Sequence, residues 1–143
     1  MGFPWTPGTS EQRSMRRLYR NYIRGCERRN IYWNLTQEQF HKLTSAPCAY
    51  CDRLPGSKVR SYTYNGIDRV DNSKGYIVTN SVTCCKECNF IKNNSLLSFE
   101  EMRCMAQALK DYRKSKGVTH VMATPPKKLS QWSDIPGGND PGA

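Results

Sequence analysis

Apolar side chains recur at helical spacing in the first third of the chain. From Glu11 to about Arg29 they fall on one face, which is the pattern of an amphipathic helix, at Met15, Leu18, Tyr19, Tyr22 and Cys26. The segment Thr9-Ser-Glu-Gln12 has the side chains of a capping box, so the helix is predicted to begin there. Residues 1–10 precede it as a segment rich in proline and glycine, which is predicted to be extended.

Two further helices carry the same signals. Thr36-Gln-Glu-Gln39 repeats the capping box, and a helix is predicted from Thr36 to about Ser45. Pro47 then stops that helix. Ser98-Phe-Glu-Glu101 caps a last helix, which Gly117 ends. The apolar face of this last helix is formed by Phe99, Met102, Ala106 and Leu109.

The central segment has the patterns of a hairpin and a short helix. The first strand is predicted from the alternating apolar residues Tyr62, Tyr64, Ile67 and Val70. Asp71 to Gly75 is the predicted turn, Tyr76 to Cys84 the second strand, and Cys88 to about Asn94 a helix. Arg53 to Arg60 is predicted to be a loop. The expected fold class is therefore α+β, with a strand-strand-helix core and flanking helices.

The last part of the chain lacks this periodicity. Residues 117–143 contain Pro125-Pro126 and Gly137-Gly138 with few apolar residues, so we expect a disordered tail. Residues 11–116 are then the one small domain. Its core is expected to be thin, because hydrophobic residues make up 37% of the chain and the mean hydropathy is −0.76.

The charge of the chain favours a polyanionic partner. Lys and Arg number 22 against 12 for Asp and Glu, which gives a net charge of +10 and a pI near 9.4. Six arginines gather on one face of the first predicted helix, namely Arg13, Arg16, Arg17, Arg20, Arg24 and Arg28. We expect them to contact the phosphates of double-stranded DNA, although a charged helix face is often only solvated. A homodimer is compatible with this sequence.

Two pairs of cysteines have the spacing of zinc ligands. Cys48-Ala-Tyr-Cys51 and Cys85-Lys-Glu-Cys88 predict one closed, structural zinc site that adds to folding stability. Cys84 is an alternative to Cys85, but the two-residue gap favours Cys85. A disulfide framework is the other alternative. The odd count of 7 cysteines and the lack of a secretory leader or a long apolar run favour a reducing, intracellular compartment without a membrane.

The remaining cysteines and the central polar residues have separate roles. Cys26 and Cys104 are interpreted as buried small hydrophobic residues.

Asp68 and Asn89 lie on predicted facing elements, and a carboxylate with an amide oxygen suits Mg²⁺ or Mn²⁺. Phosphodiester hydrolysis needs such a cation and an activated water. The competing interpretation is that both residues are only caps.

The segment from Ile31 to Met105, and above all Gly66 to Lys92, resembles the HNH endonuclease family with its ββα-metal core. The family carries an Asp-His pair on the first strand, and Asp68-Arg69 stands at that place here. The resemblance implies that Asn80 braces the hairpin loop, Asn89 binds the catalytic cation and Lys92 faces a phosphate. Gly-Ile-Asp-Arg is typical of a phage-type subgroup, which implies a bacterial, phage-infected or viral host cell.

Arg69 cannot act as the general base, because its guanidinium stays protonated in proteins. We expect it to stabilise charge on the scissile phosphate. The base is then left open among His41, Tyr76, Asp71, His120 and bulk solvent. The predicted function is a metal-dependent DNA endonuclease of homing, mobile-element or restriction type. The alternative is a zinc-stabilised nucleic-acid-binding module without cleavage activity.

Overall fold

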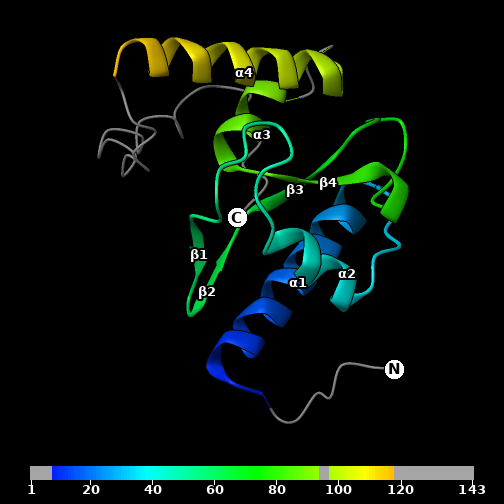
Figure 1. Cartoon of the computed structure of the whole chain (residues 1–143). Coiled ribbons are helices and arrows are strands. Elements are labelled where there is room, and N and C mark those ends of the chain that lie inside the picture. The colour runs from blue at the N-terminus through cyan, green and yellow to red at the C-terminus, as the bar shows by residue number, and fades with distance from the viewer. Residues whose placement is uncertain (1–7, 94–96, 118–143) are drawn as a thin grey trace, which may run out of the picture. The chain divides into compact units, whose positions relative to one another are not determined.

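A computed structural model of the chain describes residues 8–93 and 97–117 (Figure 1). The chain divides into two units, residues 1–106 and 107–143, and each is considered by itself. Residues 1–7 of the predicted extended segment 1–10, residues 118–143 of the predicted tail 117–143, and with them His120, lie outside the described residues. Among the helices that are described, none has both the length and the apolar character needed to span a membrane.

The first two helices begin at their predicted capping boxes. Helix α1 (Ser10–Arg28) follows Thr9, whose hydroxyl accepts the N–H of Gln12 while the Gln12 side chain accepts the N–H of Thr9. Helix α2 (Gln37–Thr44) is closed in the same way by Thr36 and Gln39. Each box satisfies two amide groups that a helix start leaves without partners. These two predicted helices are therefore confirmed to within a residue at their start.

One hydrophobic cluster joins α1, α2 and the strands. Its central contacts are aromatic, with the rings of Tyr19 and Tyr22 at 5.4 and 5.2 Å from that of Phe40 in edge-on geometry. Cys26 is 1% exposed within this cluster, as predicted. Cys104, by contrast, is exposed on the last helix, so its predicted burial is wrong. Two residues of helix advance about 200°, which turns Cys104 away from the buried Met102.

The segment after the first cysteine pair forms a hairpin that the sequence did not predict. Strands β1 (Ser57–Val59) and β2 (Tyr62–Tyr64) pair in antiparallel register, so the predicted loop from Arg53 to Arg60 is wrong at residues 57–59. Tyr62 and Tyr64 also belong to a different strand from Ile67. Buried Asn65 separates them, because its N–H bonds to the Thr44 carbonyl and its side chain bonds to two other carbonyls.

The second hairpin has shorter strands than predicted. Strands β3 (Gly66–Arg69) and β4 (Ser81–Cys84) pair with Asp68 opposite Val82. The prediction that the second strand begins at Tyr76 is wrong, because the Tyr76 backbone bonds instead to Tyr32 and Asn34 at 2.8 Å. A 3-10 turn, η1 (Val78–Asn80), follows.

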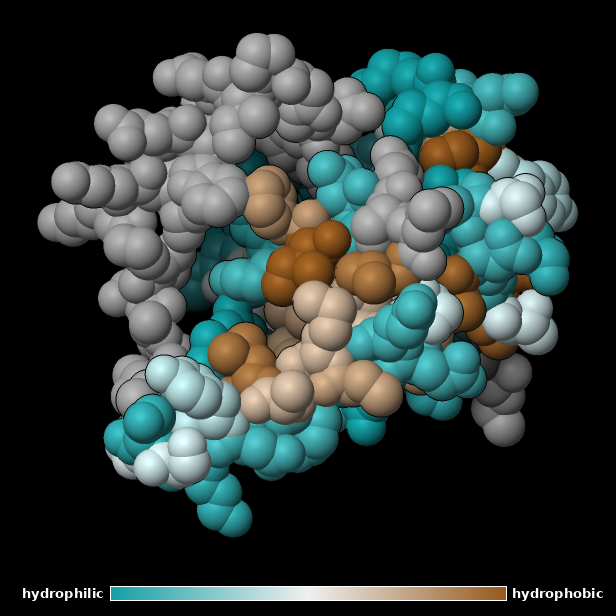
Figure 2. Space-filling model, turned by 90° about the horizontal axis from the view of Figure 1, so that it is seen from above, coloured by the Kyte–Doolittle hydropathy of each residue, from teal (hydrophilic) through white to brown (hydrophobic). Residues whose placement is uncertain are grey.

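Helix α3 (Lys86–Lys92) completes the strand-strand-helix unit and lies against β3. It begins two residues before the predicted start at Cys88, because Cys85 caps it. Helix α4 (Phe99–Ser115) starts at the predicted Ser98 cap. The α+β class and the ββα core are thus confirmed. The face of the molecule in Figure 2 shows apolar residues exposed among hydrophilic ones. On α3, the exposed large apolar side chains are Phe90 and Ile91.

Candidate metal centre and active site

Four cysteine sulfurs converge at the start of α3. The Sγ atoms of Cys48, Cys51, Cys85 and Cys88 all lie within 4.8 Å of one another, and those of Cys51 and Cys85 are 3.6 Å apart. A tetrahedral zinc ion with Zn–S bonds of about 2.3 Å requires sulfurs about 3.8 Å apart. The donor set and its spacing therefore fit zinc, and the four cysteines can hold that ion as predicted.

Local backbone bonds explain why the cysteines meet. In the first pair, Cys48 donates its N–H to the Arg53 carbonyl and accepts that of Asp52, whose φ of 62° closes a tight turn. In the second, the Cys85 sulfur caps α3 by accepting the N–H of Cys88. Hydrogen bonds from the other thiols, that of Cys51 foremost, lower the pKa of Cys48. The bond with Cys48 is in turn the main cause of a raised pKa of Cys85 and of Cys88, so a bound cation would be needed to deprotonate all four thiols.

The carboxylate of Asp68 lies in the interior next to this centre. Its residue is 9% exposed, and its Oδ2 accepts hydrogen bonds from the Tyr50 hydroxyl and from Nζ of Lys92, both at 2.7 Å. Lys92 is 3% exposed and also donates to the Arg69 carbonyl. The sequence predicted that Lys92 faces a phosphate, but in the structure its ammonium is buried and paired with Asp68.

Asn89 lies on α3 directly after a cysteine of the cluster. It is half-buried and stands three residues before Lys92, so both side chains project from one face of the helix. Among the described residues, neither Oδ1 of Asp68 nor the side chain of Asn89 takes part in a hydrogen bond. These uncommitted oxygens are of the kind that Mg²⁺ or Mn²⁺ prefers.

Arg69 supports the loop between the two strands. Its Nη1 donates to the carbonyls of Asn72 and Lys74, both at 2.9 Å, and its guanidinium lies 5.6 Å from the centre of the Tyr76 ring. Tyr76 is 7% exposed, and burial raises its pKa. A buried, protonated phenol is a poor proton acceptor at neutral pH.

Asn80 holds the same loop from the other strand. Its Oδ1 accepts the N–H of Asp71 at 2.9 Å, and its Nδ2 donates to the carbonyls of Asp71 and Gly75 at 3.0 Å. These are the backbone bonds that the family resemblance implies for this residue. The Asp71 carboxylate accepts bonds from Ser73, with the Ser73 hydroxyl the main cause of a lowered pKa. Asp71 thus bonds within its own turn.

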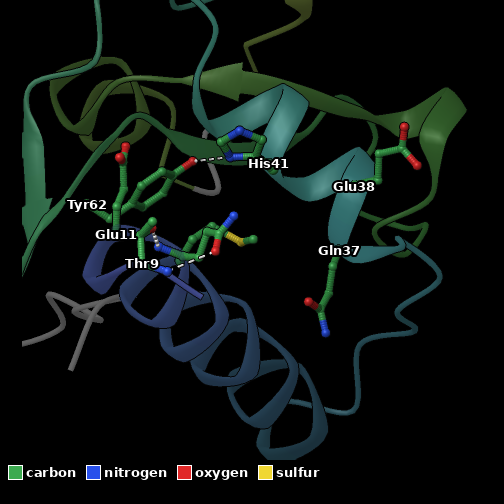
Figure 3. A pocket seen from close by; sticks show the side chains of 8 residues that line it. Thr9, Glu11, Gln37, Glu38, His41 and Tyr62 are labelled. Atoms are coloured by element: carbon green, nitrogen blue, oxygen red, sulfur yellow. Dashed lines mark hydrogen bonds between the residues drawn. The ribbon is translucent and has the colours of Figure 1, made fainter. Parts of the chain in front are cut away.

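His41 lies in a pocket lined by residues of α1, α2 and β2 (Figure 3). Its Nδ1 is 3.0 Å from the Tyr62 hydroxyl, which also bonds to Thr44. The acidic residues Glu11 and Glu38 line the same pocket, whereas Asp68 is not among the described residues that do. The structure thus brings His41 together with Tyr62.

The arginines of α1 form an exposed row. Five are exposed and Arg16 is half-buried. Five of them form no ion pair within the described part of the chain, namely Arg13, Arg17, Arg20, Arg24 and Arg28. Arg13 donates to the Gly8 carbonyl. With no acidic partner, the positive charge of this face is directed to solvent, where a polyanion can approach.

Two tyrosines at the site were missed by sequence reasoning. Tyr50 lies between Cys48 and Cys51, and the only sequence feature that could have indicated it is a hydroxyl group inside the predicted zinc-binding turn. Tyr22 had none beyond its helical spacing, yet its hydroxyl accepts the N–H of Ile67 at 3.3 Å. A Cβ on Gly66 would lie 3.0 Å from that hydroxyl and 3.2 Å from the Cys84 carbonyl. Glycine at the start of β3 is therefore explained by this close approach.

The fold and the cysteine cluster place the chain in the class of HNH-type folds. In particular, it is similar to the rare-cutting HNH restriction endonuclease PacI, whose structure was described for an extraordinary mechanism of DNA perturbation. The TM-score is 0.57 and the sequence identity 21%, and the match covers 73% of this chain and 82% of that one. The similarity shows a shared fold.

The sequence comparisons give less information about activity. The chain is 36% identical over 91 residues to uncharacterized protein R423 of Acanthamoeba polyphaga mimivirus, a match that covers 64% of this chain and 16% of that protein. The chain therefore matches only a small part of the length of protein R423. No family model matches the chain. The predicted phage-type subgroup stays a prediction.

Proposed function

We propose that the chain is a metal-dependent endonuclease that hydrolyses phosphodiester bonds in double-stranded DNA. The observation that carries this proposal is the position of Asp68. Its carboxylate is buried on β3 against α3, next to the helix turn that bears Asn89, and one of its oxygens has no partner among the described residues. The PacI similarity supports the nuclease class.

Two kinds of metal fit the residues. The four cysteines would hold a structural zinc, and Asp68 with Asn89 would hold Mg²⁺ or Mn²⁺. A divalent cation at such a site supplies Lewis acidity and lowers the pKa of a bound water. The chain's own part would be to present the two oxygen ligands from separate elements, Asp68 from strand β3 and Asn89 from helix α3.

Arg69 still has donors for a phosphate. Only its Nη1 is used in the loop bonds, and its Nε and Nη2 form no hydrogen bond with the described residues. The side chain is half-buried. We propose that these donors stabilise charge on the scissile phosphate.

Solvent is the proton acceptor that we propose for the attacking water. Tyr76 is protonated and buried, Asp71 is bonded to Ser73, and His41 faces Tyr62. Each of these alternatives would require a side chain to leave the contacts described above. A divalent cation held by Asp68 and Asn89 would lower the pKa of a water, and release of that proton to solvent would require no side chain to move.

The exposed row of arginines on α1 supports DNA as the proposed partner. A helix side with Arg17, Arg20, Arg24 and Arg28 outside any ion pair among the described residues can follow a duplex backbone through charge-assisted bonds to phosphates. The net charge of +10 acts in the same direction at longer range.

A second function, a zinc-stabilised nucleic-acid-binding module, is favoured by one observation. The ammonium of Lys92 neutralises Asp68, so a binding protein would have a stable interior at this point without any second cation. The two functions differ only in whether the Asp68 carboxylate takes up a divalent ion.

A plasmid assay distinguishes the two. Purified chain would be incubated with supercoiled DNA in Mg²⁺, in Mn²⁺ and in EDTA, alongside the variants Asp68→Ala and Asn89→Ala. We expect nicked or linear product with either cation, none in EDTA, and none from either variant. Asn89→Ala should retain DNA binding and zinc, whereas Asp68→Ala also leaves the Lys92 ammonium buried without its counter-ion, so zinc content and thermal unfolding are measured for both variants. Tight DNA binding by the wild type without cleavage in any metal would replace the endonuclease by the binding module.

A further inference from the structure

Tyr50 connects the cysteine cluster to Asp68. It lies between Cys48 and Cys51, and its hydroxyl donates to Oδ2 of Asp68 at 2.7 Å. The connection is direct: one side chain of the metal-binding turn reaches one carboxylate of the β3–β4 hairpin. None of the roles assigned so far to zinc, cation or DNA contacts uses this residue.

The turn that carries Tyr50 is fixed to the same hairpin. The N–H of Ala49 bonds to the Thr83 carbonyl on β4 at 2.8 Å, and the neighbouring residue of β4, Val82, is the one that pairs with Asp68. The backbone of the turn and the backbone of Asp68 are thus tied to adjacent positions of one strand. Their separation is set by sheet hydrogen bonds and not by flexible side chains.

The side chain of Tyr50 is also immobilised. It is 1% exposed, and its ring centre lies 5.2 Å from that of Phe99 at the start of α4. Its hydroxyl carries the proton that the Asp68 carboxylate accepts, so Tyr50 acts as the donor of this bond. A buried hydroxyl without an acceptor would be costly, which holds Tyr50 to Asp68.

Tyr50 and Lys92 act on the same oxygen but differ in charge. Both donate to Oδ2 of Asp68, which leaves Oδ1 as the oxygen available to a ligand. Lys92 brings a positive charge that repels an incoming cation at short range. The phenol orients the carboxylate without that repulsion, which is the property required of a group that supports a metal ligand.

We propose that Tyr50 is a positioning residue that holds the Asp68 carboxylate in the orientation needed to bind the divalent cation. This proposal rests on the proposed function, because it assumes a cation at Asp68. It adds that the zinc-binding turn supports the cation site through one hydrogen bond, in addition to stabilising the fold.

The test measures cation binding without DNA. Mn²⁺ would be titrated into zinc-loaded protein and the free ion followed by its paramagnetic resonance signal, for wild type, Tyr50→Phe, Tyr62→Phe and Asp68→Ala. Tyr62 is a matched control: it is 2% exposed and its hydroxyl bonds to Thr44 and His41. Both substitutions remove one buried hydroxyl, but only one removes a bond to Asp68.

We expect Tyr50→Phe to raise the half-saturating Mn²⁺ concentration about tenfold or more, the usual effect of losing such support. Tyr62→Phe should bind Mn²⁺ like the wild type, and Asp68→Ala should not bind it at this site. Zinc content and the thermal unfolding midpoint report folding. If Tyr50→Phe loses zinc, 4-aminophenylalanine at position 50, introduced by amber suppression, keeps a para N–H donor and should retain wild-type Mn²⁺ binding.

The possible failures are distinguishable. If wild type binds Mn²⁺ through Asp68 and cleaves DNA while Tyr50→Phe binds Mn²⁺ equally well, the positioning role is overturned and the endonuclease proposal stands. Equal weakening by Tyr50→Phe and Tyr62→Phe would also overturn it, since a general loss of packing would then explain both. If wild type binds no Mn²⁺ that Asp68→Ala abolishes, both proposals are overturned together.

Discussion

Asp68 and Lys92 form a buried ion pair, with Oδ2 and Nζ 2.7 Å apart and side chains 12% and 4% exposed. The two residues come from β3 and α3, so the pair joins the strand and the helix of the ββα unit. The Lys92 ammonium thereby supplies the counter-charge that a carboxylate needs in the interior. The pair holds the C-terminal end of α3 against β3 and orients the Asp68 carboxylate. It also places the Lys92 ammonium where it donates to the Arg69 carbonyl.

The first prediction concerns stability. Lys92→Met keeps the apolar stem but leaves the Asp68 carboxylate buried without its counter-ion, so we expect the free energy of unfolding to fall by about 3–5 kcal/mol. Urea denaturation of zinc-loaded protein measures this change. The double variant Asp68→Asn/Lys92→Met removes both charges and should recover part of the loss. A single variant as stable as wild type would show that the pair contributes little.

A second prediction concerns zinc. Cys85→Ser removes one of the four clustered sulfurs, and we expect it to lose zinc and to unfold at a much lower temperature. Cys84→Ser is the matched control, because Cys84 is the preceding residue and is equally buried but lies outside the cluster. Metal analysis and thermal unfolding compare the two variants. Equal losses of zinc would mean that the ligand set is incorrectly assigned.

The third prediction tests the arginine row on α1. Replacing Arg17, Arg20 and Arg24 by Ala should weaken binding to DNA of any sequence. It should also reduce the slope of log K against log salt concentration by about 0.9 for each phosphate that the protein no longer neutralises. Fluorescence anisotropy at several salt concentrations measures both quantities.

A control with the same change in net charge is available elsewhere on the molecule. Lys42, Lys58 and Arg60 are exposed and lie outside α1, so their triple replacement by Ala removes the same charge from other surfaces. We expect this control to change the salt slope much less. If the two triple variants behave alike, total charge and not the α1 face governs binding.

Local signals explain which parts of the fold could be predicted. The capping boxes at Thr9, Thr36 and Ser98 involve residues three apart, so the starts of three helices follow from the sequence. The cysteine spacing likewise identified the metal cluster. Both kinds of signal are contained within a few neighbouring residues, and neither needs tertiary information.

The elements that were missed depend on contacts between distant residues. Strand β1 has only three residues, too short for an alternating pattern to be distinguished from a loop. The residues of β2 were predicted as part of one strand with Ile67, and the break between them depends on the bonds of Asn65 to distant carbonyls. Tyr76 was predicted to start the second strand, but its backbone bonds to Tyr32 and Asn34 instead. Lys92 was expected to face a phosphate because of its position in the family pattern, and that position does not reveal a pairing partner 24 residues away.

The last prediction concerns Arg69 and separates its two roles. Arg69→Ala removes the donors proposed for the scissile phosphate together with the bonds to the Asn72 and Lys74 carbonyls. We expect cleavage to slow by on the order of a hundredfold or more, as for the loss of one preorganised donor. Asn80→Ala is the comparison, because Asn80 also braces this loop through Asp71 and Gly75 but offers no charge to a phosphate.

If Arg69 acts only through the loop, both variants should lower the thermal midpoint and the cleavage rate in the same proportion. If it also contacts the phosphate, Arg69→Ala should lose far more rate than Asn80→Ala at equal destabilisation. Arg69→Lys should recover only part of the rate, since a point charge lacks the planar fork of donors. Arg69→His is the final comparison. With solvent as the proton acceptor, histidine there should not restore the wild-type rate, and faster cleavage by this variant would show that the site lacked a general base.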